Sequence, residues 1–501
     1  MAGYSEITQR LLTRNQDFQS TGFKYSQHVS SQYSLNLRKA KRHSSHNKKR
    51  QIQSSLISSS LPSQIQSLLY SSLSRSELFT SIFLLQSPPI TQQELLQGLQ
   101  LALAPKLSKD LGPEIQPELI SRLIDLLDYS PEENCKLILD ILINLYYYYS
   151  ITIESSLNIK TIQVLYKFLN GKNEELASKT VWVITNIVGN DRRLKESLGE
   201  KGFGMVLVRL FNEFVEEKSI SILLWAIKIF FKDFPRFSGN WVVGFIKKIK
   251  HVIRYYEEKT VKIAANILYF IADKNNEFID CYFSFGIVSE LFNHLKSESP
   301  YLIYPILNLL NLISSSENED HTQRLLDLNI LSELSILSAS EDLKIRKLSF
   351  FGYSNIAAGT KAQRRLLIED FSFIKIFDGL NDPEYEVINE AVICLSNLAA
   401  LINESELEQL YQLGVFNKLE KLIKSHSVVF DLFGTELLSF IDKLLRYATR
   451  SQMTELSQTG LQDCIDSLVL NENCSELAQK VLKNHFSENK VDLFTPNTFH
   501  F

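Results

Sequence analysis

The feature that most constrains this sequence is an internal repeat with a step of about 42 residues. Seven segments share one pattern, in which a block of apolar residues is followed by asparagine or a substitute, two apolar residues and a small one. The steps between the asparagine positions are 42, 43, 41, 41, 44 and 42 residues. The asparagine column consists of Asn144, Asn186, Ile229, Phe270, Asn311, Asn355 and Asn397. Such regularity predicts that each unit folds alike and packs against the next.

Each repeat is predicted to be helical. Segments 118–127, 161–169, 289–295 and 415–423 place apolar residues at i, i+3, i+4 and i+7, and no run alternates cleanly over six residues. A small or turn-forming residue recurs before a helix, and it is Gly202, Gly286, Asn329 or Gly414. Such a residue permits a sharp bend between the first two helices of a three-helix unit. The long third helix would then carry the asparagine column on the concave face.

A period of roughly 40–47 residues is typical of armadillo and HEAT repeats. We therefore predict an all-α fold, a right-handed α-solenoid of about ten armadillo repeats preceded by a flexible basic arm. The expected organisation is an arm over residues 1–55, a solenoid over residues 56–490 and a short tail over residues 491–501. The concave groove is the expected binding surface of such a fold.

The composition argues against several classes of protein. Apolar residues make up 45% and charged residues 22% of the chain, which indicates a large core. With only 18 glycines and 12 prolines, sandwiches, barrels and glycine-rich doubly wound enzymes are disfavoured. The five cysteines form no CxxC pair, and HExxH, GxGxxG, GxSxG and phosphate-binding-loop motifs do not occur. No charge-free apolar run reaches 18 residues. We expect a soluble protein of a reducing compartment, with no membrane span, enzymatic activity, cofactor or metal.

Charge is divided unevenly along the chain. The first 50 residues hold ten Lys or Arg and two acidic residues, whereas the other 451 residues hold 43 basic and 55 acidic residues. The basic segment is poor in large apolar residues, so it cannot bury enough surface to fold alone. A basic arm on an acidic body fits nucleic acid, an acidic protein or the chain's own groove. No aromatic residue lies within the main basic cluster at 38–50, so direct nucleic-acid binding is not expected.

Several stretches resemble one family, the importin-α nuclear import adaptors. Residues 35–42, LNLRKAKR, resemble the V-E-L-R-K-A-K-K core of that family's importin-β-binding segment. Residues 342–367 are similar to its W-x-x-S-N-I-x-A-G-x-x-x-Q unit, with Phe351 in the tryptophan position. Residues 181–191 resemble its V-W-A-x-x-N-I-x-G-D unit, and residues 472–486 resemble its last helical unit. The resemblance therefore covers nearly the whole chain.

The resemblance implies partners. Importin-β would bind the arm through Arg14, Phe18, Arg38, Lys39, Lys41, Arg42, Lys48, Lys49 and Arg50. Cargo proteins would bind the groove through basic nuclear localisation signals, and a nuclear export receptor would recycle the chain through its C-terminal repeats. The protein would then shuttle between cytoplasm and nucleus. When importin-β is absent, the cluster at 48–50 would occupy the chain's own groove.

In that family, Trp-x-x-x-Asn pairs line the groove, one pair in each repeat. Residues four apart share a helical face, so lysine stems lie between indoles while the asparagine amide holds the peptide backbone. Here Trp182 and Asn186 form the one complete pair, and Asp140 stands in an earlier tryptophan position. The C-terminal half keeps more polar groups, so a basic peptide is expected to prefer it. The candidate groove residues are Asn144, Trp182, Asn186, Trp225, Asn311, Phe351, Ser354, Asn355, Glu390 and Asn397.

Alternatives remain open at this point. The asparagines could instead satisfy backbone groups between stacked helices, and Trp182 and Trp225 could belong to the core. The chain could also be a binding scaffold of the β-catenin kind, with no transport role. A third possibility is a divergent adaptor that carries cargo without ordinary signals.

Overall fold

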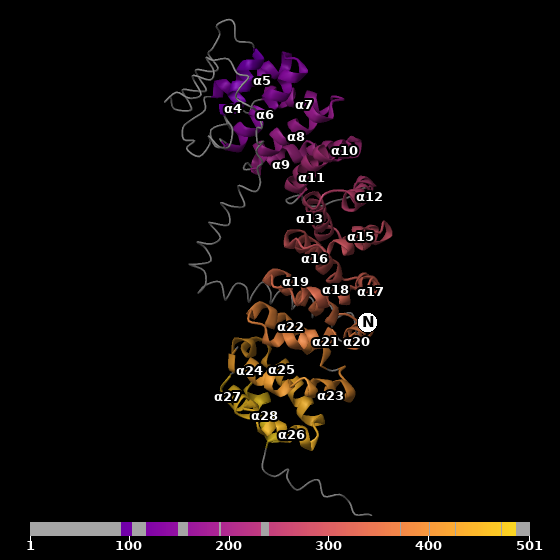
Figure 1. Cartoon of the computed structure of the whole chain (residues 1–501), viewed down its shortest axis with the longest axis vertical. Coiled ribbons are helices and arrows are strands. Elements are labelled where there is room, and N and C mark those ends of the chain that lie inside the picture. Colours follow the sequence, from indigo (N-terminus) through magenta and orange to yellow (C-terminus); the bar gives the residue numbers. More distant parts are fainter. Residues whose placement is uncertain are drawn as a thin grey trace, which may run out of the picture. The chain divides into compact units, whose positions relative to one another are not determined.

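The computed structural model describes residues 92–102, 117–148, 159–189, 192–231, 240–370, 372–399, 401–425, 427–471 and 473–486. The chain divides into two compact units, Met1–Phe234 and Pro235–Phe501. The predicted arm at 1–55, with all its proposed importin-β-binding residues, and the predicted tail at 491–501 lie outside the described residues. Figure 1 shows the helices with their labels.

Unit 1 is all-helical in its described part. Its helices are α4 (Gln92–Ala102), α5 (Pro117–Tyr129), α6 (Glu132–Tyr148), α7 (Ile159–Leu169), α8 (Glu174–Val188), α9 (Arg192–Glu200), α10 (Phe203–Glu213) and α11 (Glu217–Phe231). The segments predicted at 118–127 and 161–169 fall within α5 and α7, so both predictions are confirmed.

Unit 2 is likewise all-helical where it is described. Its α-helices are α12 (Asn240–Tyr255), α13 (Glu258–Lys274), α14 (Ile279–Ser284), α15 (Ile287–His294), α16 (Pro300–Ser314), α17 (Glu319–Asp327), α18 (Ile330–Leu337), α19 (Leu343–Ala357), α20 (Lys361–Glu369), α21 (Ser372–Asp378), α22 (Tyr385–Leu398), α23 (Glu404–Gln412), α24 (Val415–Ser425), α25 (Ser427–Tyr447), α26 (Arg450–Ser457), α27 (Leu461–Ser467) and α28 (Ser475–His485). Short 3₁₀ turns are η4 (Asn276–Phe278), η5 (Gly379–Asn381) and η6 (Leu468–Leu470).

The predicted bend between the first two helices of a repeat is present in both units. Gly202, Gly286 and Gly414 have φ of 82°, 69° and 71°, and Asn329 has φ of 64°. Each of these residues immediately precedes a second helix, namely α10, α15, α24 or α18. Glycine adopts this left-handed conformation without strain, and asparagine tolerates it better than most residues. The turn residues read from the sequence therefore mark a real backbone requirement.

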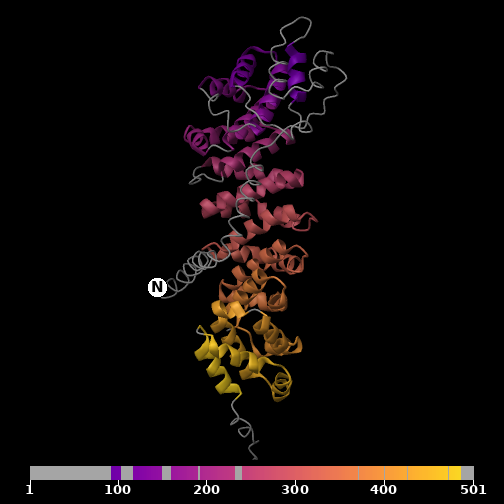
Figure 2. The same cartoon turned by 90° about the vertical axis from the view of Figure 1, so that its left-hand side faces the viewer.

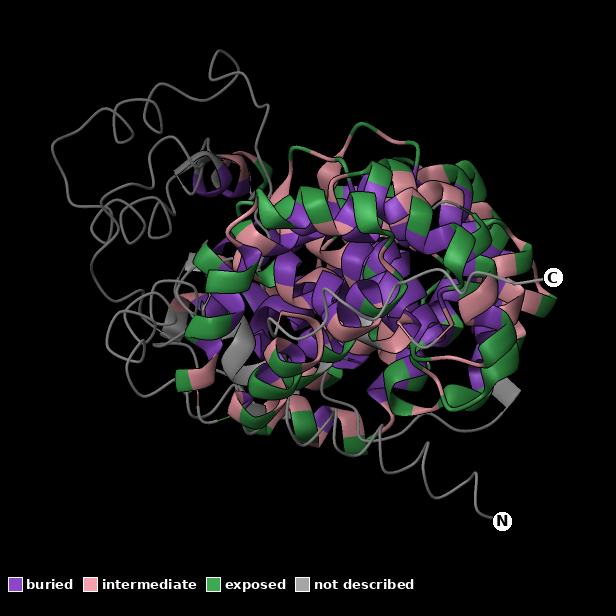
Figure 3. Ribbon diagram, turned by 90° about the horizontal axis from the view of Figure 1, so that it is seen from below, coloured by how far each residue is buried: buried purple, intermediate pink, exposed green. Residues whose placement is uncertain are grey.

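The segments that carry the asparagine column are third helices, and they pack side by side. In unit 1, α6 contacts α8 and α8 contacts α11; in unit 2, α13, α16, α19, α22 and α25 contact one another in chain order. Figure 2 shows the helices of unit 2 stacked in successive layers. Buried residues lie between the helices and exposed residues on their outer sides (Figure 3). Each unit is thus a stack of helical repeats, and the predicted α-solenoid is confirmed.

The starts of α6 and α8 in unit 1 are each hydrogen-bonded to the next repeat. Glu132 at the start of α6 accepts a hydrogen bond of 2.6 Å from Asn173, the N-cap residue of α8. Glu174 at the start of α8 accepts from the backbone N–H groups of Val215 (3.2 Å) and Glu216 (2.9 Å), just before α11. A helix leaves N–H groups at its beginning without partners inside the helix. Just before α11 the Glu174 carboxylate supplies two of these partners, whereas Glu132 binds the side-chain amide of the α8 N-cap residue.

Candidate functional site

The asparagine column lies at the interface between third helices. Asn186 of α8 is fully buried, and its Nδ2 donates to the backbone carbonyl of Ile143 in α6 at 3.0 Å. Asn355 of α19 is also buried, and its Nδ2 donates to the carbonyl of Asn311 in α16 at 3.1 Å. The Nδ2 of Asn311 donates to the carbonyl of Leu348 in α19 at 2.9 Å. This geometry favours the packing alternative, because a ligand would have to displace these bonds before it could use the same N–H groups.

The two ends of the column differ from each other. Asn144 of α6 is buried, with 1% of its surface exposed. Asn397, at the end of α22, is partly exposed, and its backbone carbonyl accepts from Nη1 of Arg364 at 3.2 Å. Among the asparagines that were candidates for a groove, Asn397 therefore offers more accessible surface than Asn144, Asn186, Asn311 or Asn355.

Trp182 and Trp225 contact each other directly. Their ring centroids lie 6.3 Å apart with the planes at 70°, which is an edge-to-face arrangement. Trp225 of α11 is 3% exposed, whereas Trp182 of α8 is partly exposed. A lysine stem between two parallel rings needs van der Waals contact of roughly 3.5–4 Å on each side, hence about 7–8 Å between the planes. The edge-to-face contact leaves no such slot, in contrast to the parallel walls that the family resemblance implies.

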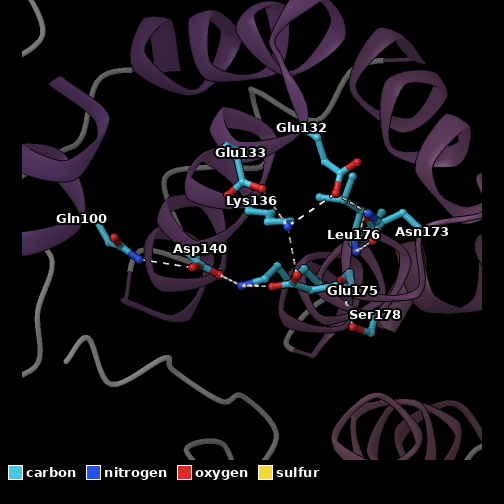
Figure 4. Close-up of polar contacts among 11 residues, drawn as sticks. Gln100, Glu132, Glu133, Lys136, Asp140, Asn173, Glu175, Leu176 and Ser178 are labelled. Atoms are coloured by element: carbon cyan, nitrogen blue, oxygen red, sulfur yellow. Dashed lines mark hydrogen bonds and ion pairs between the residues drawn. The ribbon is translucent and has the colours of Figure 1, made fainter. Parts of the chain in front are cut away.

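A buried polar network occupies the position of an earlier tryptophan. Asp140 of α6 forms an ion pair with Lys179 of α8 and accepts from Nε2 of Gln100 in α4 at 3.2 Å (Figure 4). Lys136, one turn earlier on α6, contacts Glu133 at 3.0 Å and Glu175 of α8 at 3.3 Å. Burial raises the pKa of Asp140 above its ordinary value, although the neighbouring Lys179 acts to lower it. The network joins α4, α6 and α8. A charged residue, Asp140, therefore stands where the family pattern has an aromatic side chain.

The remaining candidates lie where α19 meets α22. Glu390 of α22 is 6% exposed, and its Oε2 accepts from the hydroxyl of Ser354 in α19 at 2.7 Å. Phe351, one turn before Ser354, is partly exposed. Asn311, Ser354, Asn355 and Glu390 therefore form a continuous buried polar seam from α16 to α22. Phe351 is the aromatic side chain beside that seam with surface available to a ligand.

An aromatic edge at the start of α16 was missed by sequence reasoning. Tyr301 is 69% exposed, and the Nζ of Lys262 lies 5.0 Å from its ring centroid. The ring of Tyr304 lies 6.4 Å from that of Tyr301, and its hydroxyl donates to Asp342, the N-cap residue of α19. The Nζ of Lys344 lies 5.6 Å from the Tyr304 ring. Two tyrosines three residues apart in the first two turns of a third helix are the signal that could have revealed this edge.

Within the described residues, no group of three or more His, Cys, Asp or Glu side chains is arranged to hold a metal ion. In the same part of the chain, none of the helices combines the length and the apolar character that crossing a membrane requires.

Comparisons with known proteins give a distant relationship. No protein-family model matches the sequence. Importin subunit alpha-1b from Oryza sativa subsp. japonica is 20% identical over 187 residues, which cover 37% of this chain and 35% of the rice protein. The match therefore spans about a third of that relative's length. The chain is similar to importin alpha at this level and over part of its length.

The similarity to solved structures concerns the fold. An engineered protein from the Northeast Structural Genomics Consortium has a TM-score of 0.63 at 18% identity and covers 83% of this chain and 100% of its own. A designed armadillo repeat protein in complex with the peptide (KR)4 has a TM-score of 0.40 at 24% identity over 48% of this chain and 98% of its own. The first of these agrees with the α-solenoid architecture.

Proposed function

We propose that this chain is a nuclear import adaptor that binds importin-β through its basic N-terminal arm and cargo through the solenoid. The observation that carries the proposal is the charge division, with ten basic and two acidic residues in the first 50 and an acidic remainder. The LNLRKAKR stretch and the 20% identity to a rice importin alpha support it. An extended basic segment suits the acidic inner surface of a partner by long-range charge complementarity.

The cargo of this adaptor would include proteins with basic nuclear localisation signals, bound in the concave groove. Recycling would involve a nuclear export receptor at the C-terminal repeats, and the protein would shuttle between cytoplasm and nucleus. This part of the proposal rests on the resemblance of the sequence to the importin-α family. An α-solenoid of stacked third helices is a suitable framework for it, because such a fold presents an extended surface to a peptide.

One observation favours a second candidate, a divergent solenoid adaptor that binds other proteins without recognising conventional signals. Trp182 and Trp225 pack edge to face, and Asn186, Asn311 and Asn355 use their amide N–H groups on neighbouring helices. Conventional signals need open aromatic slots and accessible amides. Under this second candidate, the arm would still recruit importin-β while cargo would contact other surfaces of the solenoid.

Binding of the full-length chain to purified importin-β tests the main proposal. Reversing the charge of Arg38, Lys39, Lys41 and Arg42 to glutamate should weaken binding by about a hundredfold or more, and added salt should weaken binding of the unaltered chain progressively. A matched control reverses four exposed lysines of the body, Lys172, Lys201, Lys296 and Lys421. Unchanged affinity after reversal in the arm would defeat the adaptor proposal and favour the scaffold alternative.

A further inference from the structure

α12 is the most basic of the described helices. Its sixteen residues hold Lys247, Lys248, Lys250 and Arg254 and no acidic residue. The chain beyond residue 50 is acidic overall, with 55 acidic and 43 basic side chains. α12 therefore concentrates positive charge on a body that is acidic overall.

The charges of α12 lie on its outer face. Phe245, Ile249 and Val252 are fully buried and hold the helix against its repeat. Lys247 and Arg254 are exposed, and Lys250 is partly exposed. Residues three and four apart share a helical face, so these three cations form one row. The row extends over about 10 Å at ~1.5 Å of rise per residue.

Two of the three cations of this row have no ion-pair partner among the described residues. Lys247 and Lys250 have no ion pair with any described residue, and Arg254 is 3.8 Å from Glu290 of α15. The other lysine-rich second helix, α24, differs, because Lys418 pairs with Asp378 and Lys424 with Glu420, each at 2.5 Å. Positive charge without counter-charge on a folded surface raises the local concentration of anionic partners.

The end of the row carries a small aromatic cluster. Tyr255 is 62% exposed, its ring lies 4.7 Å from that of His251, and the Arg254 guanidinium lies 5.4 Å from its centroid. These contacts orient Arg254 and Tyr255 at the outer surface. The rings of this cluster pack against one another, whereas surfaces that bind polynucleotides present several rings to successive bases.

We propose that the outer face of α12, defined by Lys247, Lys250, Arg254 and Tyr255, binds a short acidic peptide segment of a partner protein. An extended peptide advances ~3.3 Å per residue, so the ~10 Å row accommodates three or four residues rich in Asp or Glu. The short length of the row thus favours a short acidic segment over a long polyanion such as a nucleic acid.

Binding of a fluorescent peptide with four consecutive glutamates, flanked by glycines, tests this surface at low ionic strength. All proteins are full-length and carry glutamine at the seven arm positions Arg38, Lys39, Lys41, Arg42, Lys48, Lys49 and Arg50, because the arm would otherwise bind an acidic probe. The test variant is Lys247→Gln/Lys250→Gln/Arg254→Gln. The matched control is Lys172→Gln/Lys201→Gln/Lys421→Gln, which removes the same charge from exposed sites elsewhere.

We expect the α12 variant to lose about tenfold or more in affinity relative to the control. The charge-reversed variant Lys247→Glu/Lys250→Glu/Arg254→Glu should in turn bind a peptide of four lysines more tightly than the unreversed chain does. Equal affinities of test and control variants would overturn the proposal. Tighter binding of a ten-nucleotide single strand through the same three residues would also overturn it and identify nucleic acid as the partner. The proposal is independent of importin-β binding, because every protein in the test carries substitutions at the arm residues proposed to bind importin-β.

Discussion

Asn311 of α16 and Asn355 of α19 join their two helices in opposite directions. The Nδ2 of Asn355 donates to the backbone carbonyl of Asn311 at 3.1 Å, and the Nδ2 of Asn311 donates to the carbonyl of Leu348 at 2.9 Å. Both side chains are 4% exposed, so water cannot readily replace either bond. The reciprocal pair specifies how α16 and α19 align, which apolar contacts alone would leave less well defined.

Removing this pair should destabilise the solenoid. Asn355→Ala leaves a buried carbonyl with one partner fewer and a cavity in place of the amide, so we expect a loss of about 1–3 kcal/mol in the free energy of unfolding. Urea denaturation followed by circular dichroism, with hydrogen exchange of α16 and α19, measures it. Asn308→Ala is the matched control, because Asn308 is an exposed asparagine on α16, the helix that Asn355 contacts. If Asn355→Ala and Asn308→Ala have the same urea midpoint of unfolding, Asn355 does not have the packing role inferred for it.

The repeat architecture could be predicted from the sequence because its signals are local. Amphipathic periodicity sets each helix, and the residues at 202, 286, 329 and 414 are types that tolerate positive φ. N-cap signals are equally readable, as in Thr360 with Gln363 and Thr449 with Gln452, both of which form capping boxes. Such features depend on residues a few positions apart, so their meaning changes little with tertiary context.

The role of the asparagine column could not be predicted in the same way. An asparagine amide can form the same hydrogen bonds with the backbone of a ligand or with that of a neighbouring helix. Which of the two it contacts depends on how its helix is rotated about the helix axis. On α16, Asn308 is exposed, whereas Leu307 and Asn311 are buried.

The buried pair of Asp140 and Lys179 gives a second prediction. Lys179→Met removes the cation beside a carboxylate that is 9% exposed, and we expect a loss of about 3–5 kcal/mol in the free energy of unfolding. The double variant Asp140→Leu/Lys179→Met should recover most of that loss, since no buried charge remains. Urea denaturation measures both, with Lys172→Met at an exposed site as the control. A double variant no more stable than the single one would contradict this account.

The contact between Tyr304 and Asp342 predicts a pH effect. Burial and the hydrogen bond to Asp342 raise the pKa of Tyr304 to about 12 from its ordinary value near 10.0. Because the folded pKa lies above the unfolded one, this contribution to stability is complete below pH 10 and is lost as pH rises through about 12. The difference in denaturation midpoint between the unaltered chain and Tyr304→Phe should therefore hold from neutral pH to about 9 and shrink above 10.

Tyrosinate absorbance provides an independent check on the same pair. Subtracting the titration of Tyr304→Phe isolates Tyr304, which should ionise near pH 12. Asp342→Asn keeps an N-cap side chain for α19 but removes the negative charge, so it should shift that ionisation toward 10. An ionisation of Tyr304 near 10 in the unaltered chain would show that the hydrogen bond does not persist in solution.

The packing of Trp182 against Trp225 leads to the last prediction, on basic peptides. Because the two indoles meet edge to face at 6.3 Å, a lysine stem has no slot between them. We expect Trp182→Ala to change the affinity for a labelled basic peptide less than twofold, since an open slot would contribute roughly 0.5–2 kcal/mol. Fluorescence anisotropy measures the affinity, and tryptophan emission should not shift on binding. Phe351→Ala, which removes a partly exposed ring in the C-terminal half, is the comparison variant. A tenfold loss with Trp182→Ala and none with Phe351→Ala would mean that the indoles separate to admit the peptide, and that the N-terminal repeats still bind conventional signals.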